Sequence, residues 1–524
     1  MTEAVVITEL NQRASLRTWV AVLGGIIGAF MAVLDIQITN ASLPDIEGGI
    51  GTGSSNGTWI STSYLIGEII MIPLTDYLSR VFSFRRLLLT NACLFLVFSV
   101  GCAFAENLTQ MIFMRALQGF TGGVMIPMAF TLVLTQLPRS QRPIGIAIFA
   151  MTATFAPAVG PTIGGYLTDN FGWQYVFFIN VIPGSLMILL LYGSLDRQPL
   201  NLGLLKEGAW LSVGCMAVGL AAFQTFLDEG NQYGWFDSDY IIKLACVAAV
   251  FLILFIIIDL TIAKPLLPLR LLARRNFGLG TLVNVLVGFA LYGSVYVLPT
   301  YLGQVQGYDA EQIGLTLAWI GFPQLLLIPF VPILQKYVDA RLIVFVGLCI
   351  FATSCFMNIH MSANFSGPQF EVSNLVRAMG QAVVLAPLTG IAMVGISQSE
   401  SAGASGIFNM LRSLGGAIGT AALATFITQR EKFHSNIIGQ SVTEYSVASQ
   451  EQLRSLKRYF RSRGTSSESL SEGLALKALA DEISQQALIM AFSDTFLALG
   501  AILLIAATSI AFTKGDPTVR RLRS

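Results

Sequence analysis

Charge is scarce in this chain. Of its 524 residues, 12% are Asp, Glu, Lys or Arg and only two are histidines, whereas 54% are hydrophobic. A soluble domain usually carries about twice that charged share, and so much apolar surface cannot be hidden in a soluble core, so it must face lipid. The formal net charge of +1 argues against nucleic acid as a partner.

Sequence motifs of several catalytic classes are also missing. The chain has no GxxxxGK[ST] phosphate loop and no HExxH, which argues against ATP drive within the chain and against a membrane metalloenzyme. Its six cysteines lie inside apolar segments without metal-ligand spacing, so we interpret them as packing residues. We therefore expect a protein that is not an enzyme and holds neither cofactor nor metal.

What the sequence does contain is long apolar runs, each near the twenty residues that a bilayer requires. They predict an all-α integral membrane protein with fourteen spans, at about 18–39, 57–78, 86–105, 109–133, 143–167, 174–194, 208–227, 240–262, 278–303, 313–335, 341–360, 370–395, 403–427 and 492–513. The polar start with Arg13 and Arg17 runs straight into the first span, which predicts a retained membrane helix and not a cleaved signal peptide.

The distribution of basic residues predicts the orientation. Alternate connections contain no Lys or Arg, at about 40–56, 106–108, 168–173, 228–239, 304–312 and 361–369, whereas the connections between them are basic. Because cytoplasmic loops carry the excess of Lys and Arg, both termini are expected in the cytoplasm.

The stretch APAVGPTIGGYL (156–167) interrupts one of the spans with prolines and glycines. Its conformational candidates are Gly160, Pro161, Gly164 and Gly165. Neighbouring helices can satisfy the carbonyls that prolines free in a membrane, and glycines four residues apart let two helices approach closely. The run predicts a bent, tightly packed helix at a moving interface, with ordinary packing by small residues as the alternative.

Ionisable side chains within the spans are expensive in hydrocarbon and are candidates for function. Asp35 either exchanges a proton or pairs permanently with Arg115, and Glu68 either titrates or stays protonated as a hydrogen-bond donor. Arg115 and Arg377 could instead snorkel to the outer interface, and Asp494 is expected to cap a helix.

A greasy cavity for a small hydrophobic substrate is the other expectation. Its candidate residues are Asn40, Tyr64, Phe155, Tyr292, Tyr296, Phe408 and Arg412. Most aromatic side chains in such a chain face lipid or pack helices, which is the alternative for each of them.

A weak internal repeat predicts the domain organisation. FMRAL (113–117) and LVRAM (375–379) each open a span and are followed by small residues and a proline. We expect a six-helix bundle over 1–194, two inserted helices over 195–262, and a second bundle over 263–524 that contains a long outer loop at about 428–491. That loop carries two amphipathic patterns, and its stripe of Leu476, Leu479 and Ile483 is expected to dock on a partner or to rest on the outer leaflet.

Several motifs resemble one family in order along the chain. They are LDIQITNASLP (34–44), FMRALQGFTGG (113–123), the run at 156–167, WQYVFFINVIPG (173–184), LDEGNQYGWFDSDYII (227–242) and FNMLRSLGGAIG (408–419). They are similar to motifs of the fourteen-span EmrB/QacA-type drug:proton antiporters of the major facilitator superfamily, and most of all to EmrB-like pumps.

This resemblance implies a major facilitator fold in the inner membrane and export of hydrophobic compounds in exchange for protons. The candidates for proton coupling are Asp35, Glu68 and Arg115; the family motifs do not supply Glu68, which is a candidate only because its charge lies deep in a span. It also implies a periplasmic adaptor, a membrane fusion protein, together with an outer-membrane channel. An importer or facilitator on the same fold, or an exporter of one metabolite such as a siderophore or fatty acid, is the alternative.

One family motif departs from its pattern. The second-to-third connection, expected as GxLaDRxGRRxxL, reads DYLSRVFSFRRL (76–87), with Asp76 and Ser83 at its glycine positions and Arg80 at its aspartate position. The candidates for an inner gate are Asp76, Arg80, Arg85 and Arg86, and Asp76 and Arg80 have the spacing of an ion pair on one helix face.

Overall fold

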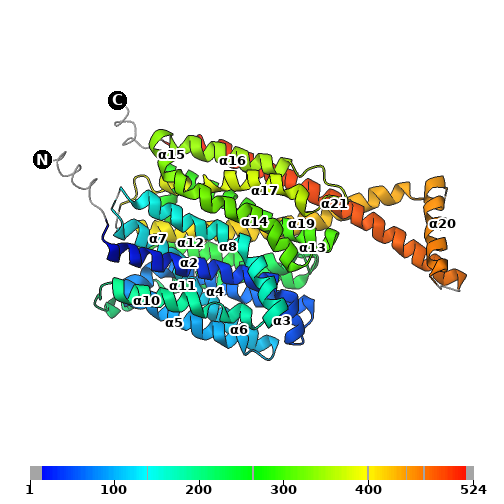
Figure 1. The fold of residues 1–524 in the computed structure, drawn as a ribbon. Coiled ribbons are helices and arrows are strands. Elements are labelled where there is room, and N and C mark those ends of the chain that lie inside the picture. The colour runs from blue at the N-terminus through cyan, green and yellow to red at the C-terminus, as the bar shows by residue number, and fades with distance from the viewer. Residues whose placement is uncertain are drawn as a thin grey trace.

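The computed structural model describes residues 14–138, 140–262, 265–397, 400–443, 445–463 and 467–514, and within these ranges it is helical without strands. The first half of the chain forms one bundle (Figure 1). Its helices are α2 (Leu16–Ala41), α3 (Leu43–Gly49), α4 (Ser54–Phe82), α5 (Phe84–Ala103), α6 (Leu108–Gly122), α7 (Met125–Gln136), α8 (Arg142–Phe171), α9 (Tyr175–Phe178) and α10 (Val181–Ser194).

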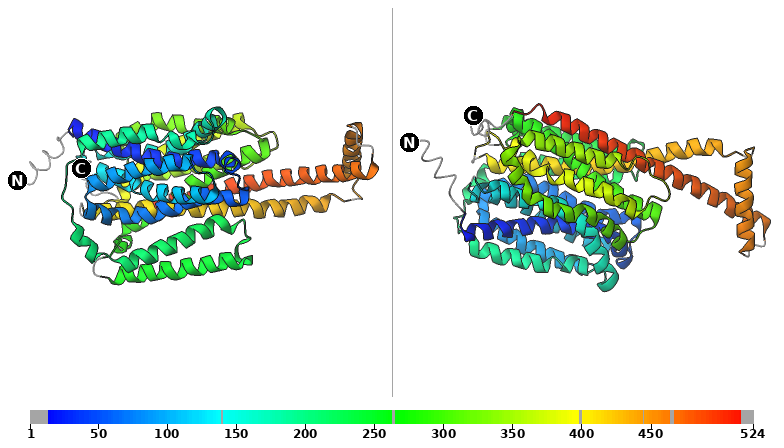
Figure 2. Two further views of the ribbon diagram at one scale, coloured as in Figure 1. Left: turned by 90° about the horizontal axis from the view of Figure 1, so that it is seen from below. Right: turned by 45° about the horizontal axis from the view of Figure 1, so that its top comes forward.

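An additional helix pair and a second bundle follow. The 3-10 turn η1 (Leu202–Glu207) leads to α11 (Trp210–Gly230), η2 (Trp235–Asp237) and α12 (Asp239–Thr261), which lie together beside the bundles (Figure 2). The second bundle contains η3 (Leu269–Ala273), α13 (Arg275–Gln306), α14 (Ala310–Leu327), η4 (Ile328–Phe330), α15 (Val331–Tyr337), α16 (Ala340–Phe356), α17 (Gly367–Ala382), α18 (Leu385–Ala392), α19 (Ser401–Ser441), α20 (Val447–Ser462) and α21 (Glu468–Ile510).

Each predicted span coincides with one helix or with consecutive helices. Eleven segments are long and apolar enough to cross a membrane, or twelve if the bent α8 is one span, among the described residues. The apolar α16 is shorter and α4 is not among these segments, so the count of fourteen spans stays a prediction. Few residues of the very apolar α12 are buried within the protein, as expected for a helix that faces lipid.

Both bundles bring helix backbones into direct contact through glycine. A Cβ on Gly119 of α6 would overlap the carbonyl oxygen of Tyr64 on α4 and lie 2.7 Å from its carbonyl carbon. On Gly415 of α19 it would lie 3.0 Å from the Cα of Val285 on α13. Because lipid tails are as apolar as side chains, this close packing is a main source of attraction between membrane helices.

The two ends of the molecule differ in character. We call the end where α2 begins and α21 finishes the basic end; it carries Arg17, Arg80, Arg274, Arg341 and Lys514. At the opposite end, the hairpin end, α19 and α21 project beyond the bundles and α20 lies across their tips (Figure 1). The segment predicted as a loop over 428–491 is thus mostly helical, because the two flanking spans continue as helices into it.

The projecting hairpin stands well away from the bundles. Gln485 still donates a hydrogen bond to the carbonyl oxygen of Val305 at the bundle edge, 3.3 Å away. From there α21 extends outward to Glu468, about 25 Å at the usual helical rise, where ion pairs Lys457–Glu472 (2.6 Å) and Arg461–Glu468 (2.8 Å) attach α20 to it. This separation favours a contact beyond the membrane surface over the alternative in which the amphipathic helix rests on the outer leaflet.

We predict that Gly119→Ala lowers the thermal unfolding temperature by several degrees, whereas Gly214→Ala does not. The alanine at 119 forces α6 from the α4 backbone, and overpacking of this kind costs about 1–3 kcal/mol. Gly214, inside α11, has no neighbour within 4 Å of an added Cβ. Scanning fluorimetry of both purified variants measures the difference, and equal melting of the two would show that the α4–α6 contact is not tight.

Candidate functional site

A buried ion pair lies at the centre of the first bundle. Nη1 of Arg115 on α6 donates to Oδ2 of Asp35 on α2 at 2.5 Å, and both side chains are completely inaccessible. Nε of the same guanidinium donates to the carbonyl oxygen of Ile60, 3.2 Å away on α4. The pair thus connects three helices, and the expectation that Arg115 snorkels to the interface is wrong.

Side-chain amides complete the coordination of the carboxylate. Oδ1 of Asp35 accepts from Nδ2 of Asn180 at 2.6 Å and from Nε2 of Gln118 at 2.9 Å. Asn180 also donates to Ser99 at 3.0 Å, and the Gln118 carbonyl accepts from Arg115 at 2.8 Å. Desolvation of two charges is expensive unless further hydrogen bonds satisfy them. This network satisfies both oxygens of Asp35 and two of the three nitrogens of Arg115, whereas Nη2 of Arg115 has no partner among the described residues.

Aromatic rings surround the guanidinium. The ring of Tyr64 lies 4.3 Å from Cζ of Arg115, and its hydroxyl donates to the carbonyl oxygen of Ala32 at 3.2 Å. Such stacking favours a cation, more so in a desolvated setting. Tyr64, predicted as a cavity residue, is completely buried and supports the ion pair.

The repeat-related arginine has a different environment. Arg377 on α17 is buried, donates from Nη1 to the carbonyl oxygen of Ser294 at 3.4 Å, and lies 5.6 Å from the ring centroid of Phe351. Its Nε and Nη2 have no hydrogen-bond partner among the described residues, and no carboxylate there pairs with it. Arg377 does not snorkel either, so that expectation is also wrong.

A second group of charges lies where the two bundles meet. Glu68 of α4 is 7% exposed, and no hydrogen bond joins its side chain to a described residue. Its charged neighbours are Arg115 and Asp35 in its own bundle and Arg412 on α19 in the other. Arg412 is buried and donates to Asn409 at 3.0 Å, and Tyr292 of α13 has both Glu68 and Arg412 as charged neighbours.

The glycine–proline run forms a bent helix, as predicted. The two parts of α8, Arg142–Pro157 and Val159–Phe171, meet at 46°. A Cβ on Gly160 would overlap that of Gln37 on α2, and one on Gly164 would lie 2.9 Å from the carbonyl oxygen of Ile38. Pro161 and Gly165 are buried as well.

The same part of α8 also contacts the other bundle. Its Thr162 fills the space beside Gly314 of α14, where an added Cβ would overlap the threonine. The ring of Phe155 lies 6.1 Å from that of Phe30 on α2 and 6.0 Å from that of Phe322 on α14. The structure therefore brings Phe155, a predicted cavity residue, to the seam between the bundles.

The remaining cavity candidates are dispersed. Phe408 is buried in the second bundle, and its carbonyl oxygen accepts from Asn284 at 2.8 Å. Asn40 is exposed at the end of α2 and accepts from Ser61 at 2.5 Å. These two residues do not join the Glu68 group.

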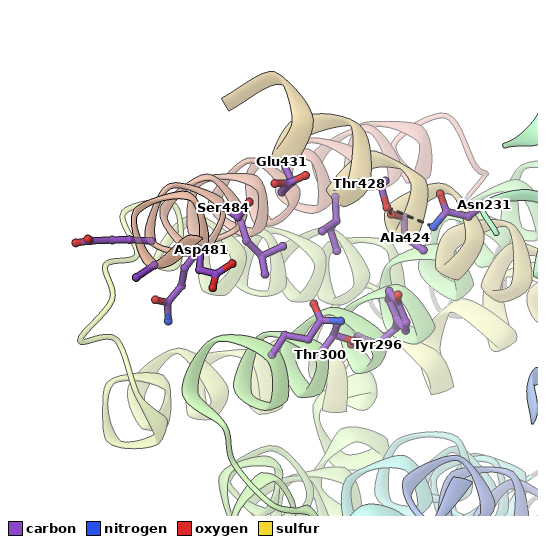
Figure 3. Close-up of a pocket in the computed structure, with 14 residues that line it drawn as sticks. Asn231, Tyr296, Thr300, Ala424, Thr428, Glu431, Asp481 and Ser484 are labelled. Carbon is purple, nitrogen blue, oxygen red and sulfur yellow. Dashed lines mark hydrogen bonds between the residues drawn. The ribbon is translucent and has the colours of Figure 1, made fainter. Parts of the chain in front are cut away.

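Tyr296 lines a separate cavity near the hairpin end, with a volume of about 820 Å³ (Figure 3). The helices α13, α19 and α21 form it, and Asn231 at its edge donates to Thr428 at 3.3 Å. Glu431, Asp481 and Glu482 give it an acidic lining.

Comparison with known proteins agrees with this arrangement of two bundles. The model of the Major Facilitator Superfamily matches residues 25–420. The chain belongs to this superfamily. The colistin resistance protein EmrB of Acinetobacter baumannii is 34% identical over 93% of this chain and 95% of its own length. The multidrug export protein EmrB of Escherichia coli K12 is 30% identical over 93% and 94%.

A solved structure supports the fold independently. The proton:xylose symporter XylE aligns with a TM-score of 0.57 and 15% identity over 94% of each chain. This chain is thus a multi-pass membrane protein and a transporter. The prediction of its family and fold from sequence is confirmed.

In this major facilitator, the departing motif lies at the basic end. Nη2 of Arg80 donates to Asp76 at 3.1 Å, as predicted. Asp76 is also near the other bundle, because a Cβ on Gly403 of α19 would lie 3.8 Å from its Oδ2. Arg85 donates to the carbonyl oxygen of Tyr192 at 2.8 Å, and Arg86 is exposed.

The basic end contains a further ion pair that the sequence analysis did not predict. Arg274, just before α13, donates to Glu400, just before α19, at 2.6 and 3.0 Å. Hydrogen bonds from Arg274 and Ser397 lower the pKa of Glu400 to about 2. The pair therefore stays ionised across the physiological pH range.

The expectation that Asp494 caps a helix is wrong. Asp494 lies inside α21; its Oδ2 accepts from Nε of Arg430 and lies within hydrogen-bond distance of Nε2 of His434, both at 2.7 Å. The two partners come from the extended part of α19, so the contact depended on a helix extension that the span prediction had not included.

Ser83, at a glycine position of the family motif, has a backbone conformation that favours glycine. It has φ 68° and connects α4 to α5, and its buried hydroxyl has no hydrogen-bond partner among the described residues. We predict that Ser83→Gly raises the free energy of unfolding by about 1 kcal/mol, because glycine adopts positive φ without strain. Denaturation of the purified variant measures it. Ser79→Gly, within helix α4, is the control and should destabilise; stabilisation by both would refute the strain.

Proposed function

We propose that this transporter is a secondary active exporter of hydrophobic compounds, driven by proton antiport across the inner membrane. The observation that carries the proposal is a set of charged groups around Glu68. Its side chain lies at the seam without a hydrogen bond to a described residue, and its charged neighbours are Arg412 of the opposite bundle and the buried Asp35–Arg115 pair of its own bundle. Polar groups inside membrane proteins mark proton and substrate paths, and the similarity to export proteins gives the direction.

The two carboxylates are suited to different tasks. Asp35 accepts three hydrogen bonds from Arg115, Gln118 and Asn180, so protonation would cost bonds that favour the charged form. Glu68 has no such partner and lies at the seam. We propose that Glu68 carries the proton and that the Asp35–Arg115 pair holds the helices that position it, with Asp35 as the alternative carrier.

Substrate specificity is proposed from similarity and not from the geometry of the charged groups. The two EmrB relatives are named for colistin resistance and for multidrug export, so similarity supports efflux of diverse compounds. Phe155, Tyr292 and Arg412 line the proposed substrate path at the seam. Transport of one metabolite, or import by the same fold, stays as the alternative.

Glu68→Gln is predicted to abolish proton-driven uptake of a fluorescent substrate into inverted vesicles while downhill exchange continues. The amide has nearly the carboxyl's size but cannot take up or release a proton. Asp35→Asn should instead lower the unfolding temperature, since the loss of one partner leaves a buried charge uncompensated at a cost of about 3–5 kcal/mol.

The control for both is Glu106→Gln, at an exposed position between α5 and α6. Proton-driven uptake by Glu68→Gln at the control's rate would exclude Glu68 as the carrier and favour Asp35.

We also propose that the hairpin end faces the periplasm, with both termini in the cytoplasm, and that the hairpin contacts an adaptor protein that leads to an outer-membrane channel. The basic end supports the orientation by the positive-inside rule. The hairpin's distance from the bundles and its exposed Val447, Leu470 and Leu476 support a protein contact. Leu479 and Ile483, predicted for docking, are half-buried within the hairpin.

Replacement of Val447, Leu470 and Leu476 by Ser is predicted to reduce drug resistance of whole cells at least fourfold and to leave transport in inverted vesicles unchanged. Vesicles require only the pump, whereas cells require the complete path across the envelope. The matched control is Glu451→Ser, exposed on the same hairpin. Equal loss in both assays would show that these residues support the transporter fold.

A further inference from the structure

A second cavity, of about 1,050 Å³, opens at the basic end, away from the Glu68 group. Its walls come from both bundles: residues 140–151 at the start of α8, and residues 328–341, 387–394 and 513–514 of the second bundle. Its size is at the upper limit for pockets that hold drug-sized molecules. Because it spans the seam, any occupant would contact both parts that move during transport.

One part of this cavity is apolar. Ile144, Ile148 and Met151 of α8 line it together with Ile328, Ile391 and Val394 of the second bundle. An apolar surface of this kind favours a hydrocarbon group over water. No ionisable side chain comes from the α8 wall, so the apolar side of the cavity is continuous.

The other part carries an excess of positive charge. Lys336, Arg341 and Lys514 line it, with Asp339 as the acidic residue in the lining. Arg341 binds Asp339 at 2.8 and 3.2 Å and also donates to the carbonyl oxygen of Thr513. The two lysines have no ion pair among the described residues, so an anion in the cavity would find two free ammonium groups.

We propose that this cavity binds an amphipathic anion, with a carboxylate or sulfate head near Lys336 and Lys514 and a single alkyl tail along α8. A hydrophobic cation would be repelled by the lysines, and a small anion would leave the apolar wall unused. The role of this cavity rests on the proposed function: the cavity binds an anionic substrate at the basic end before the substrate is exported.

Binding is tested with the full-length protein in phosphatidylcholine nanodiscs and the fluorescent probe 11-(dansylamino)undecanoic acid. The double variant Lys336→Gln with Lys514→Gln is expected to weaken binding about tenfold, as the loss of two partly exposed charge contacts would. Lys336→Arg with Lys514→Arg should keep the affinity. Lys243→Gln with Lys432→Gln, two exposed lysines outside the cavity, is the matched control.

The tail is tested separately. Ile148→Trp should fill the space beside the apolar wall and lower the affinity for the probe at least tenfold. The methyl ester of the probe, which has no charge, should bind equally well to the wild type and to the Lys336→Gln, Lys514→Gln variant. Equal affinity of the acid for the wild type and both Lys→Gln pairs would overturn the proposal, as would loss of affinity by the arginine variant together with normal folding.

An anionic phospholipid also combines a negatively charged head with alkyl chains. The titration is therefore repeated in nanodiscs that contain phosphatidylglycerol. Undiminished probe binding there supports a single-chain amphiphile, whereas complete displacement would assign the cavity to membrane lipid and overturn the proposal. Because binding is measured without a proton gradient, failure of proton-driven export would not alter these results, and failure of binding would leave the export proposal standing.

Discussion

A charge pair removed from water constrains most of the first bundle. Arg115 and Asp35 are inaccessible, and their hydrogen bonds reach α2, α4 and α6 directly and the segment before α10 through Asn180. Breaking such a pair is far more costly than forming it is favourable. These helices are therefore held together as one body, and any movement during transport must take place elsewhere, at the contacts of this bundle with the second one.

In the described part of the second bundle, no ion pair corresponds to this one. Arg377 has the same place in the repeat as Arg115, yet two of its nitrogens have no hydrogen-bond partner among the described residues and Ser294 offers it only a carbonyl oxygen. The arginine thus has no carboxylate partner among the described residues. The second bundle has its titratable pair elsewhere, in His434 on the extended part of α19 and Asp494 on α21.

The sequence predicted site residues well where the residue type alone implies an energetic cost inside an apolar span. Charges inside apolar runs pointed to Asp35, Glu68 and Arg115, and glycines with prolines pointed to the bend in α8. It was a poor guide to neutral partners: Asn180 and Ser99 are as essential to the pair's coordination, but polar uncharged residues are common in spans. Phe408 and Asn40 lie apart from the Glu68 group, which the sequence could not indicate because an aromatic or amide residue type does not reveal the direction in which the side chain points.

Features that depend on several elements were beyond sequence analysis. The helices α19 and α21 continue into a polar segment that hydropathy alone marks only as outside the membrane. The basic-end cavity is assembled from four separate stretches, 140–151, 328–341, 387–394 and 513–514. The backbone of Ser83 is another example, since the sequence shows a serine at a glycine position of the family motif but does not show its positive φ.

The distribution of satisfied and unsatisfied groups links the fold to transport. In the first bundle both oxygens of Asp35 and two of the three nitrogens of Arg115 are hydrogen-bonded, whereas at the seam the Glu68 side chain has no hydrogen bond to a described residue; Arg412, like Arg115, has one nitrogen without a partner there. A group with few bonds changes its charge at little structural cost, and a charge change there alters the attraction between two bodies instead of the stability of either. Glycine-mediated contacts such as Gly314 with Thr162 lie on the same seam, and they leave little side-chain bulk to resist a rocking motion. The seam thus combines an electrostatically adjustable group with close contacts made by small residues, and alternating access by two rigid bundles requires movement at such a contact.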